Sequence, residues 1–330
     1  ATPRDSRTKR MLGVPSLIGA GAGLASALLY AAAASGSPFA LTLLYVAPLP
    51  VLLAAVGWRH TAGLVATIVG AAFLLLLVGP KTGLYFVIAV GLPSWWLAYL
   101  ALLARPGPDG GVSEWYPVGR LVIWCAVLGA ALVAATIPLV ATNLEEYRAS
   151  LRVLFERAFS APGASDTLGG DPKALIELMT TLAPSMAASF WTLASIFNLW
   201  LAGRITRSSG RLARPWPYLP GLEFPRSASL GLLVATGLSF LPGLAGLVAE
   251  LFAGTLLVAF SLLGLTVIHL WTRRSPFRPL VLFGFYAVLL LQPWLMIVLA
   301  LLGLADHFFG LKRRFGPPPS APPTAPANLP

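Results

Sequence analysis

The chain has 330 residues, of which 57% are hydrophobic and 11% are charged, and its formal net charge is +11. Globular domains carry about 25% charged residues, so a chain with a mean hydropathy of +0.79 has too few charges to cover a soluble protein of this size. These values exclude a soluble fold and predict an all-α protein, a polytopic transmembrane helical bundle.

The basic residues lie in short loops between apolar runs. In that setting Lys and Arg set membrane topology and contact anionic lipid headgroups. We therefore expect the lipid bilayer, with its anionic headgroups, as a partner, and no nucleic acid. The single cysteine, Cys125, lies inside an apolar run, which excludes an intramolecular disulfide and favours a small core residue.

A transmembrane helix needs about 20 mostly apolar residues. About nine segments of the chain meet this requirement, namely 14–34, 38–56, 61–79, 84–103, 118–141, 182–203, 227–243, 246–271 and 280–305. They predict the following organisation: a basic cytoplasmic N-terminus (1–13) without a signal-peptide cleavage site, a first helical group of five segments (14–141), an extramembrane region (142–181), a second helical group of about four segments (182–315) and a disordered Pro/Ala-rich tail (316–330).

The extramembrane region begins with a predicted amphipathic helix, "TNLEEYRASLRVLFERAF". A capping box is expected at its start, formed either by Thr142 with Glu145 or by Asn143 with Glu146. Apolar residues then fall on one helical face and charged residues on the other, so the helix is too charged to span the membrane. We expect it to lie at the membrane surface or to cap the bundle.

Arginine-rich loops indicate the orientation. The N-terminus, the loop at 204–226 and the loop at 272–279 carry the basic clusters, and nine crossings place all three on one side, which we expect to be cytoplasmic. The basic cluster at 312–314 would then lie outside. Because Gln292-Pro293 interrupts the last apolar run, that run is either a full crossing or a broken element that returns the C-terminus to the cytoplasm.

Motifs for catalysis and metal binding are missing from the sequence. There is no HExxH, GxSxG, P-loop or GxGxxG motif in the required context. The three histidines, His60, His269 and His307, are not at the spacing of metal ligands. We therefore expect no enzyme activity, no catalytic residues, no metal and no cofactor.

The sixth predicted segment carries hydroxyl and amide side chains roughly on one side of the helix. Such a stripe is expected to face protein or a watery cavity instead of lipid. Hydrogen bonding between helices and a small-molecule pocket are both open interpretations. The candidate ligand-binding residues of this stripe are Thr181, Ser185, Ser189, Thr192, Ser195 and Asn198.

Small residues recur every four positions in the first segment, at Gly19, Gly23 and Ala27. This spacing allows another helix to approach closely in lipid. Two interpretations are open: tight packing within the chain, and contact with a helix of a separate membrane-protein subunit.

Polar residues in or beside apolar runs are costly unless they are paired, so each is a candidate site. Glu250 and Gln292 are added to the candidate ligand-binding residues on this ground. Asp306 has two interpretations: an interfacial residue that fixes the last helix at the headgroups, or a buried partner of an arginine from another loop. We expect the interfacial role, because the basic cluster 312–314 follows closely along the chain.

The C-terminal stretch "GLADHFFGLKRR" resembles the signature of the YybS-like family of uncharacterised bacterial polytopic membrane proteins, which end in a Gly, an Asp three residues on and an arginine cluster. Where that family often has Gln before a late Gly, this chain has Leu263. The resemblance covers most of residues 14–314, and its other parts are "APLPVLLAAVGWRHTAG" (47–63), "LEFPRSASLGLL" (222–233) and "FSLLGLTVIHLW" (260–271).

This resemblance implies a fold similar to the substrate-binding components of energy-coupling-factor vitamin transporters, which dock on a partner through small residues of their first helix. The fold resemblance extends to membrane scaffolds of the cell-shape machinery, which transport nothing. Structural or topological roles are expected for Pro48, Pro50, His269, Asp306, Arg313 and Arg314. We expect a multi-pass protein of the bacterial inner membrane that binds or helps to transport a small molecule with a membrane-protein partner. The alternative is a non-transporting scaffold.

Overall fold

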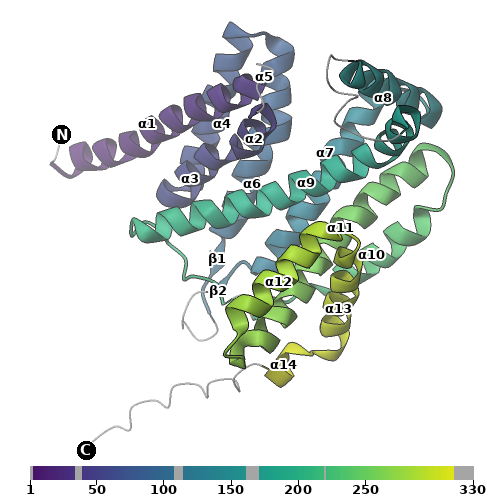
Figure 1. Cartoon of the computed structure of the whole chain (residues 1–330). Coiled ribbons are helices and arrows are strands. Elements are labelled where there is room, and N and C mark those ends of the chain that lie inside the picture. Colours follow the sequence, from purple (N-terminus) through teal and green to yellow (C-terminus); the bar gives the residue numbers. More distant parts are fainter. Residues whose placement is uncertain (1–2, 34–38, 108–113, 161–170, 219–220, 316–330) are drawn as a thin grey trace, which may run out of the picture. The chain divides into compact units, whose positions relative to one another are not determined.

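The computed structural model describes residues 3–33, 39–107, 114–160, 171–218 and 221–315 (Figure 1). Its regular structure is helical apart from one two-stranded sheet, which confirms the all-α fold. The helices are α1 (Pro3–Ala32), α2 (Ala40–Val46), α3 (Pro48–Trp58), α4 (His60–Leu77), α5 (Pro80–Phe86), α6 (Leu92–Ala101), α7 (Val118–Val140), α8 (Leu144–Phe159), α9 (Pro172–Ser208), α10 (Arg226–Leu238), α11 (Gly243–Trp271), α12 (Arg278–Leu291), α13 (Leu295–Phe309) and α14 (Lys312–Phe315). The strands are β1 (Ala104–Arg105) and β2 (Glu114–Trp115), which pair antiparallel.

The chain divides into two compact units. The first comprises Ala1–Pro217 and Pro225–Leu256, and the second comprises Tyr218–Phe224 and Leu257–Pro330. The first unit therefore contains α1 to α10 and the beginning of α11. The second contains the rest of α11 and the C-terminal helices, together with the short segment that precedes α10.

Seven helical stretches of the described residues are long and apolar enough to cross a membrane. They overlap the first six predicted segments and the eighth, so the predicted bundle of several long apolar helices is confirmed. The stretches are Gly13–Ala32, Ala40–Trp58, His60–Leu77, Pro80–Ala101, Val118–Val140, Lys173–Ser208 and Gly243–Arg274.

Two predicted segments do not form a single helix of spanning length. Segment 227–243 contains α10, whose 13 residues extend about 20 Å at 1.5 Å per residue, short of a hydrocarbon core about 30 Å thick. Segment 280–305 is divided at Gln292-Pro293 into α12 and α13, of 14 and 15 residues. Proline has no N–H to donate and its ring disfavours helix in the preceding residue, so the helix ends before Pro293.

Helices α1 and α4 pack closely in the first unit. A Cβ atom added at Gly19 or Gly23 would collide with the carbonyl oxygen of Ala62 or Ala66, respectively. The missing side chains therefore allow the two helices to approach, as small residues do in membrane bundles. Ala27, one turn further along α1, is fully buried.

Two spans of the first unit are irregular, and side chains from other helices bond to their backbone. The Ala40–Trp58 span changes from α2 to α3 at Pro48, where the hydroxyl of Ser26 donates to Ala47 O (2.6 Å) and the amide of Asn198 to Tyr45 O (2.6 Å). The Pro80–Ala101 span contains a π-turn at Val87–Gly91, and Trp191 Nε1 donates to Ala89 O (3.3 Å). Lipid supplies no hydrogen-bond donors, so such donors from neighbouring helices help to satisfy the backbone at irregular positions.

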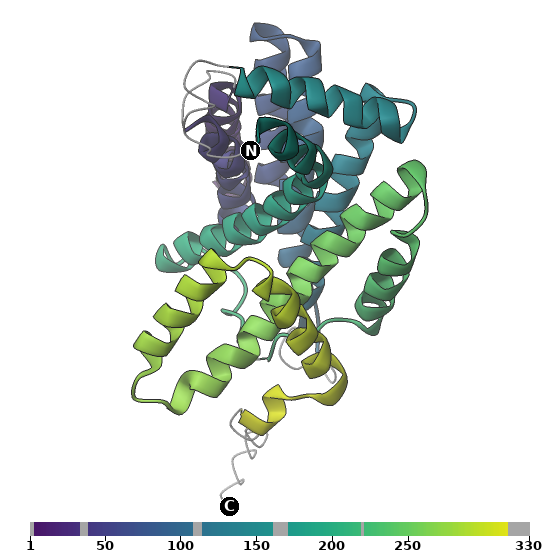
Figure 2. The ribbon, with the colours of Figure 1, turned by 45° about the vertical axis from the view of Figure 1, so that its right-hand side comes forward.

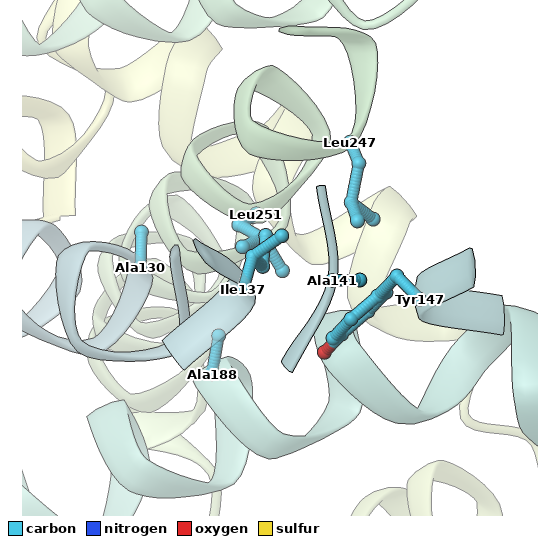
Figure 3. Close-up of a cluster of buried hydrophobic side chains, with 7 residues drawn as sticks. All are labelled: Ala130, Ile137, Ala141, Tyr147, Ala188, Leu247 and Leu251. Carbon is cyan, nitrogen blue, oxygen red and sulfur yellow. The ribbon is translucent and has the colours of Figure 1, made fainter. Parts of the chain in front are cut away.

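Helix α8 begins with the second of the two predicted caps. Asn143 Oδ1 accepts from the backbone N–H of Glu146 (2.9 Å), and Glu146 Oε2 accepts from both the N–H and the hydroxyl of Thr142 (2.8 Å each). The two bonds from Thr142 lower the pKa of Glu146. Helix α8 packs on the bundle through Tyr147, which is buried beside Ala141 (Figure 3). This burial raises the pKa of the Tyr147 phenol.

The second unit contains a helical hairpin. Helices α12 and α13 run in opposite directions on either side of residues 292–294 (Figures 1 and 2). Helix α13 crosses α11 at Gly264 and Gly303, where an added Cβ on either glycine would collide with the backbone of the other helix. Ser261 also donates its hydroxyl to Met296 O (2.6 Å). Close approach and a hydrogen bond thus hold α13 on α11.

Candidate functional site

The polar stripe predicted on α9 divides among several faces of the helix. Thr192, Ser195 and Asn198 are buried, whereas Thr181 is exposed and donates its hydroxyl to Glu177 O in its own helix (3.0 Å). Ser189 is half-buried and would be 3.9 Å from a Cβ added at the neighbouring Gly254 of α11. The six predicted residues therefore do not line one common pocket.

The buried part of the stripe takes part in helix packing. Thr192 Oγ1 donates within α9 to Ala188 O (2.9 Å) and lies 3.4 Å from the backbone oxygen of Cys125 in α7. Asn198 donates to Tyr45 O beside the α2–α3 break and to Ala194 O in its own helix (2.8 Å). These contacts favour hydrogen bonding between helices, the first of the two interpretations, for this part of α9.

Ser185 and Glu250 form a different kind of contact. The hydroxyl of Ser185 in α9 donates to Oε1 of Glu250 in α11 at 2.7 Å, and both residues are half-buried. They lie in two of the spanning stretches, 65 positions apart in the sequence. Among the described residues, Glu250 makes no ion pair. A carboxylate in a spanning helix with one hydroxyl donor is a group that can bind a ligand.

An apolar cluster lies beside this contact. It brings together α7, α8, α9 and α11 (Figure 3), and Leu247 and Leu251 of the cluster precede and follow Glu250 on α11. Ala188, one turn after Ser185, also belongs to it. The apolar surroundings lower the local dielectric, which strengthens electrostatic attraction to a bound cation and makes an uncompensated carboxylate costly. We call Ser185 and Glu250 the α9–α11 polar pair.

Thr180 was not singled out from the sequence, although it is nearly fully buried and its hydroxyl has no hydrogen-bond partner in the described structure. It continues the buried face of α9, through Pro184 and Ala188, at four-residue intervals. This interval was the signal that could have identified it. Five residues separate Thr180 from Ser185, about 140° around a helix at 3.6 residues per turn, so Thr180 faces away from the polar pair.

Gln292, the other predicted ligand residue, lies at the α12–α13 break in the second unit. Its side-chain oxygen accepts from Trp294 Nε1 at 3.0 Å, and its backbone N–H donates to Val288 O at 2.8 Å. Leu295 and Met296 donate in turn to the carbonyls of Gln292 and Pro293 (3.0 Å each). These bonds satisfy most of the polar groups at the break, which gives Gln292 a structural role.

Asp306 is buried, and its partner is Lys312. The chain reverses at Gly310, which has the left-handed φ of 61° that glycine adopts readily, and this turn returns Lys312 to the carboxylate. Asp306 Oδ1 accepts from the backbone N–H of Lys312 (2.8 Å) and Oδ2 lies 3.1 Å from Lys312 Nζ, with side chains 3% and 9% exposed. Lys312 Nζ also donates to Leu222 O.

This arrangement corrects the prediction for Asp306. The interfacial interpretation requires an exposed carboxylate, whereas the structure has a buried one. The alternative named an arginine from another loop, whereas the cation is a lysine six residues later. The ammonium group of Lys312, and not the carboxylate, contacts another segment of the chain, where it donates to the backbone oxygen of Leu222.

The other residues with predicted structural roles are placed as follows. His269 lies 3.1 Å from Leu265 O through Nδ1 and 3.3 Å from the hydroxyl of Tyr286 through Nε2, so it connects α11 to α12. Arg313 lies 3.8 Å from Glu223, and both side chains are largely exposed. Pro48 and Pro50 are in the first turn of α3, and Arg314 is in α14.

The small residues of α1 contact a helix of the same chain. Gly19 and Gly23 face α4, and Ala27 belongs to a buried cluster with Leu74 and Phe86. This is the first of the two interpretations, packing within the chain. Helix α4 occupies the face that a separate subunit would need in order to approach these glycines.

The described residues contain no group of three or more His, Cys, Asp or Glu side chains that could hold a metal ion. The polar groups of the α9–α11 pair are one carboxylate and one hydroxyl. Such oxygen donors suit a hard cation or an ammonium group, whereas they lack the nitrogen and sulfur ligands that zinc prefers.

The comparison with family models identifies the family of the chain. A family model described as "Predicted membrane protein (DUF2232)" matches residues 24–307, a range that includes the α9–α11 polar pair and Asp306. No curated protein and no solved structure matched the chain. Because the family model covers most of the sequence and the structure contains several helices of membrane-spanning length, the chain belongs to the DUF2232 family of predicted membrane proteins.

Proposed function

We propose that this multi-pass membrane protein is a binding subunit for a small, positively charged molecule and works with partner proteins in its transport. Glu250 is the group that binds the ligand charge, and Ser185 positions its carboxylate. The proposal assigns the protein to the bacterial inner membrane, and it includes no catalytic step and no cofactor. The resemblance to YybS-like proteins and to the substrate-binding components of energy-coupling-factor transporters supports the same role.

The observation that carries the proposal is the 2.7 Å contact between Ser185 and Glu250 in two spanning stretches. An ionisable residue in such a stretch is costly and is therefore retained mainly where it has a function. A hydrogen bond to a charged group contributes about 1.5–3 kcal/mol, less than the cost of holding a carboxylate in low dielectric. A bound cation would compensate that charge.

The position of the pair also fits a binding role. Glu250 is seven residues into α11, about 10 Å along the helix axis from Gly243, so it is close to one end of this span. Leu247 at this end packs in one cluster with Tyr147 of α8, the helix that follows the fifth span on the predicted outer side, so we expect this end to face outward. A ligand arriving from outside would then reach the carboxylate without crossing the hydrocarbon core.

The test uses the purified full-length protein in detergent. Thermal unfolding is followed with a panel of alkali cations and small organic ammonium compounds. A ligand that binds the folded state raises its stability by RT ln(1 + [L]/Kd), about 2.7 kcal/mol at one hundred times Kd. We expect at least one probe to raise the melting temperature of the wild type and to have no such effect on Glu250→Gln.

Glu145→Gln is the matched control, because Glu145 is exposed on α8 and the substitution removes the same charge. This variant should respond to the probe as the wild type does. Ser185→Ala should weaken the response without abolishing it, because the carboxylate remains but loses its donor. Equal responses of the wild type and Glu250→Gln, or no response to any probe, would exclude the proposed role of Glu250.

The second candidate function is a non-transporting scaffold. One observation favours it: no residue of α12 is buried, and Leu280, Phe283 and Leu290 are each more than two-thirds exposed. A helix with this much apolar surface needs either lipid or another protein to cover it. Under this alternative the partner would bind α12, and Glu250→Gln would leave the function unchanged.

A further inference from the structure

Three exposed arginines of the first unit lie over tryptophan rings. The guanidinium carbon of Arg211 is 4.5 Å from the centroid of Trp58, and those of Arg207 and Arg204 are 5.1 Å and 6.0 Å from the centroid of Trp216. We call these five residues the arginine–tryptophan face. A cation over an aromatic ring is attracted to the ring's negative face, which holds the guanidinium in place.

Arg214, in the same loop, has a different role. It donates to Ala101 O (3.0 Å) and Tyr116 O (3.3 Å) and lies 6.0 Å from the ring of Trp115. It is partly buried, and the loss of water around it lowers its pKa. Arg214 therefore fixes the loop that follows α9 against the end of α6 and the start of α7, and this positions Trp216 for the other arginines.

The arginines of the face have no counter-charge in the described structure. Arg204, Arg207 and Arg211 are exposed and form no ion pair among the described residues. The sequence contains no Asp or Glu from residue 178 to residue 222. The acidic residue described on the neighbouring hairpin, Glu114, already pairs with Arg105 at 2.6 Å. The face therefore attracts an anion from outside the chain.

The place of the face in the fold indicates which anion this is. Trp58 ends the Ala40–Trp58 span, and Arg204 and Arg207 lie in the last turns of the Lys173–Ser208 span. Ends of spanning helices lie at the level of the lipid headgroups, where tryptophan is enriched. A guanidinium that rests on a ring keeps its N–H edge available for a bidentate contact with phosphate.

We propose that the arginine–tryptophan face is a binding site for the phosphate group of an anionic phospholipid. Arg204, Arg207 and Arg211 supply the donors and the charge, while Trp58 and Trp216 hold the guanidinium groups and contact the lipid at the interface. This site is separate from the α9–α11 polar pair, so the two proposals can fail independently.

The test is native mass spectrometry of the full-length protein released from nanodiscs that contain equal amounts of phosphatidylglycerol and phosphatidylcholine. We expect the wild type to retain phosphatidylglycerol preferentially. In the triple variant Arg204→Gln/Arg207→Gln/Arg211→Gln, the ratio of bound phosphatidylglycerol to phosphatidylcholine should fall by about tenfold or more. Each basic residue near an anionic surface contributes about fivefold to the affinity for anionic lipid. Trp216→Leu should weaken the preference without changing the net charge.

The matched control is Arg226→Gln/Arg273→Gln/Arg274→Gln, which removes three exposed arginines outside the face. It should keep the preference of the wild type. Arg211→Lys retains the charge but not the planar fork, so it should lose part of the preference even if the triple variant fails to fold. The proposal is overturned if the two triple variants lose lipid equally, if the wild type shows no preference, or if inorganic phosphate binds the face while phosphatidylglycerol does not.

Discussion

Asp306 and Lys312 form a buried ion pair in the second unit, and the effect of substitution there depends on which charge is left behind. With side chains only 3% and 9% exposed, neither charge can be rehydrated without local unfolding. Replacing a buried pair by apolar residues is often neutral, whereas removing one partner leaves an uncompensated charge. The free-energy cost of removing one partner is therefore expected to exceed the net stabilisation that the intact pair provides.

Asp306→Asn is expected to lower the free energy of unfolding by about 3–5 kcal/mol, because it leaves the ammonium of Lys312 buried without an anion. Thermal unfolding in detergent measures this effect. Glu223→Gln is the control: its contact with Arg313 is exposed, so the change should be about 0–1 kcal/mol. The double variant Asp306→Leu/Lys312→Met should recover most of the loss. A silent Asp306→Asn would contradict the buried pair.

The sequence identified Asp306 as a costly polar residue but not its partner. A lysine six residues away would lie about 120° around a continuous helix from the aspartate, so the two side chains would not meet. The two meet because Gly310 ends α13 and reverses the chain, and glycine at a helix end permits such a turn without requiring it. Ser185 and Glu250 were likewise each identified, whereas their contact depends on the packing of two distant helices.

Among the elements, α12 and α13 decide the topology of the C-terminus. Each extends about 21–22 Å, less than the hydrocarbon core of about 30 Å, and they run in opposite directions about the 292–294 break (Figure 2). Both ends of such a hairpin lie on one side of the membrane. We therefore expect the basic cluster 312–314 on the same side of the membrane as the arginines of 272–279, in agreement with the positive-inside rule.

Thiol labelling tests this hairpin. Cysteines introduced by Ser275→Cys and Ser320→Cys, each in a Cys125→Ser background, should both resist an impermeant reagent in intact cells and react after the membrane is permeabilised. Ser160→Cys, at the end of α8 on the predicted outer side, is the control that should react in intact cells. Reaction at position 320 but not at 275 would mean that 278–309 crosses the membrane completely.

Helix α8 should loosen in acid. Hydrogen bonds from Thr142 lower the pKa of Glu146, so this cap contributes fully above the ordinary glutamate pKa of about 4.3 and is lost as the pH falls through the lower pKa of the folded state. Hydrogen exchange of α8, corrected for the intrinsic pH dependence, should therefore be constant from neutral pH to about pH 5 and should accelerate below it. Glu146→Gln should remove this dependence, whereas Glu145→Gln should keep it.

The sequence predicted which helices exist better than it predicted where each helix ends. Apolar runs of about 20 residues located the seven spanning stretches. The same criterion joined α12 to α13 in one segment, although Gln292-Pro293 left a broken element as the alternative, and the structure has this break. It also predicted one helix over 227–243, whereas α10 stops at Leu238 while the apolar sequence continues.

For the whole molecule, composition alone was sufficient to predict a membrane bundle, and the family match agrees with it. The division into two units was not predicted, because it depends on which helices pack together and not on how apolar each one is. The α9 stripe illustrates the same limit. Helical periodicity placed its hydroxyls on one side, but only the neighbouring helices determine which hydroxyl meets a carboxylate and which meets a backbone oxygen.

Mass spectrometry of the protein purified from its native membranes tests the central claim most directly. The account predicts a small cationic molecule that accompanies the wild type and Glu145→Gln, and that is missing from Glu250→Gln while the protein partners of the complex remain. The opposite result is a stable assembly of proteins in which neither the wild type nor the variant carries any such molecule. That result would contradict a binding subunit built on Glu250 and favour the scaffold.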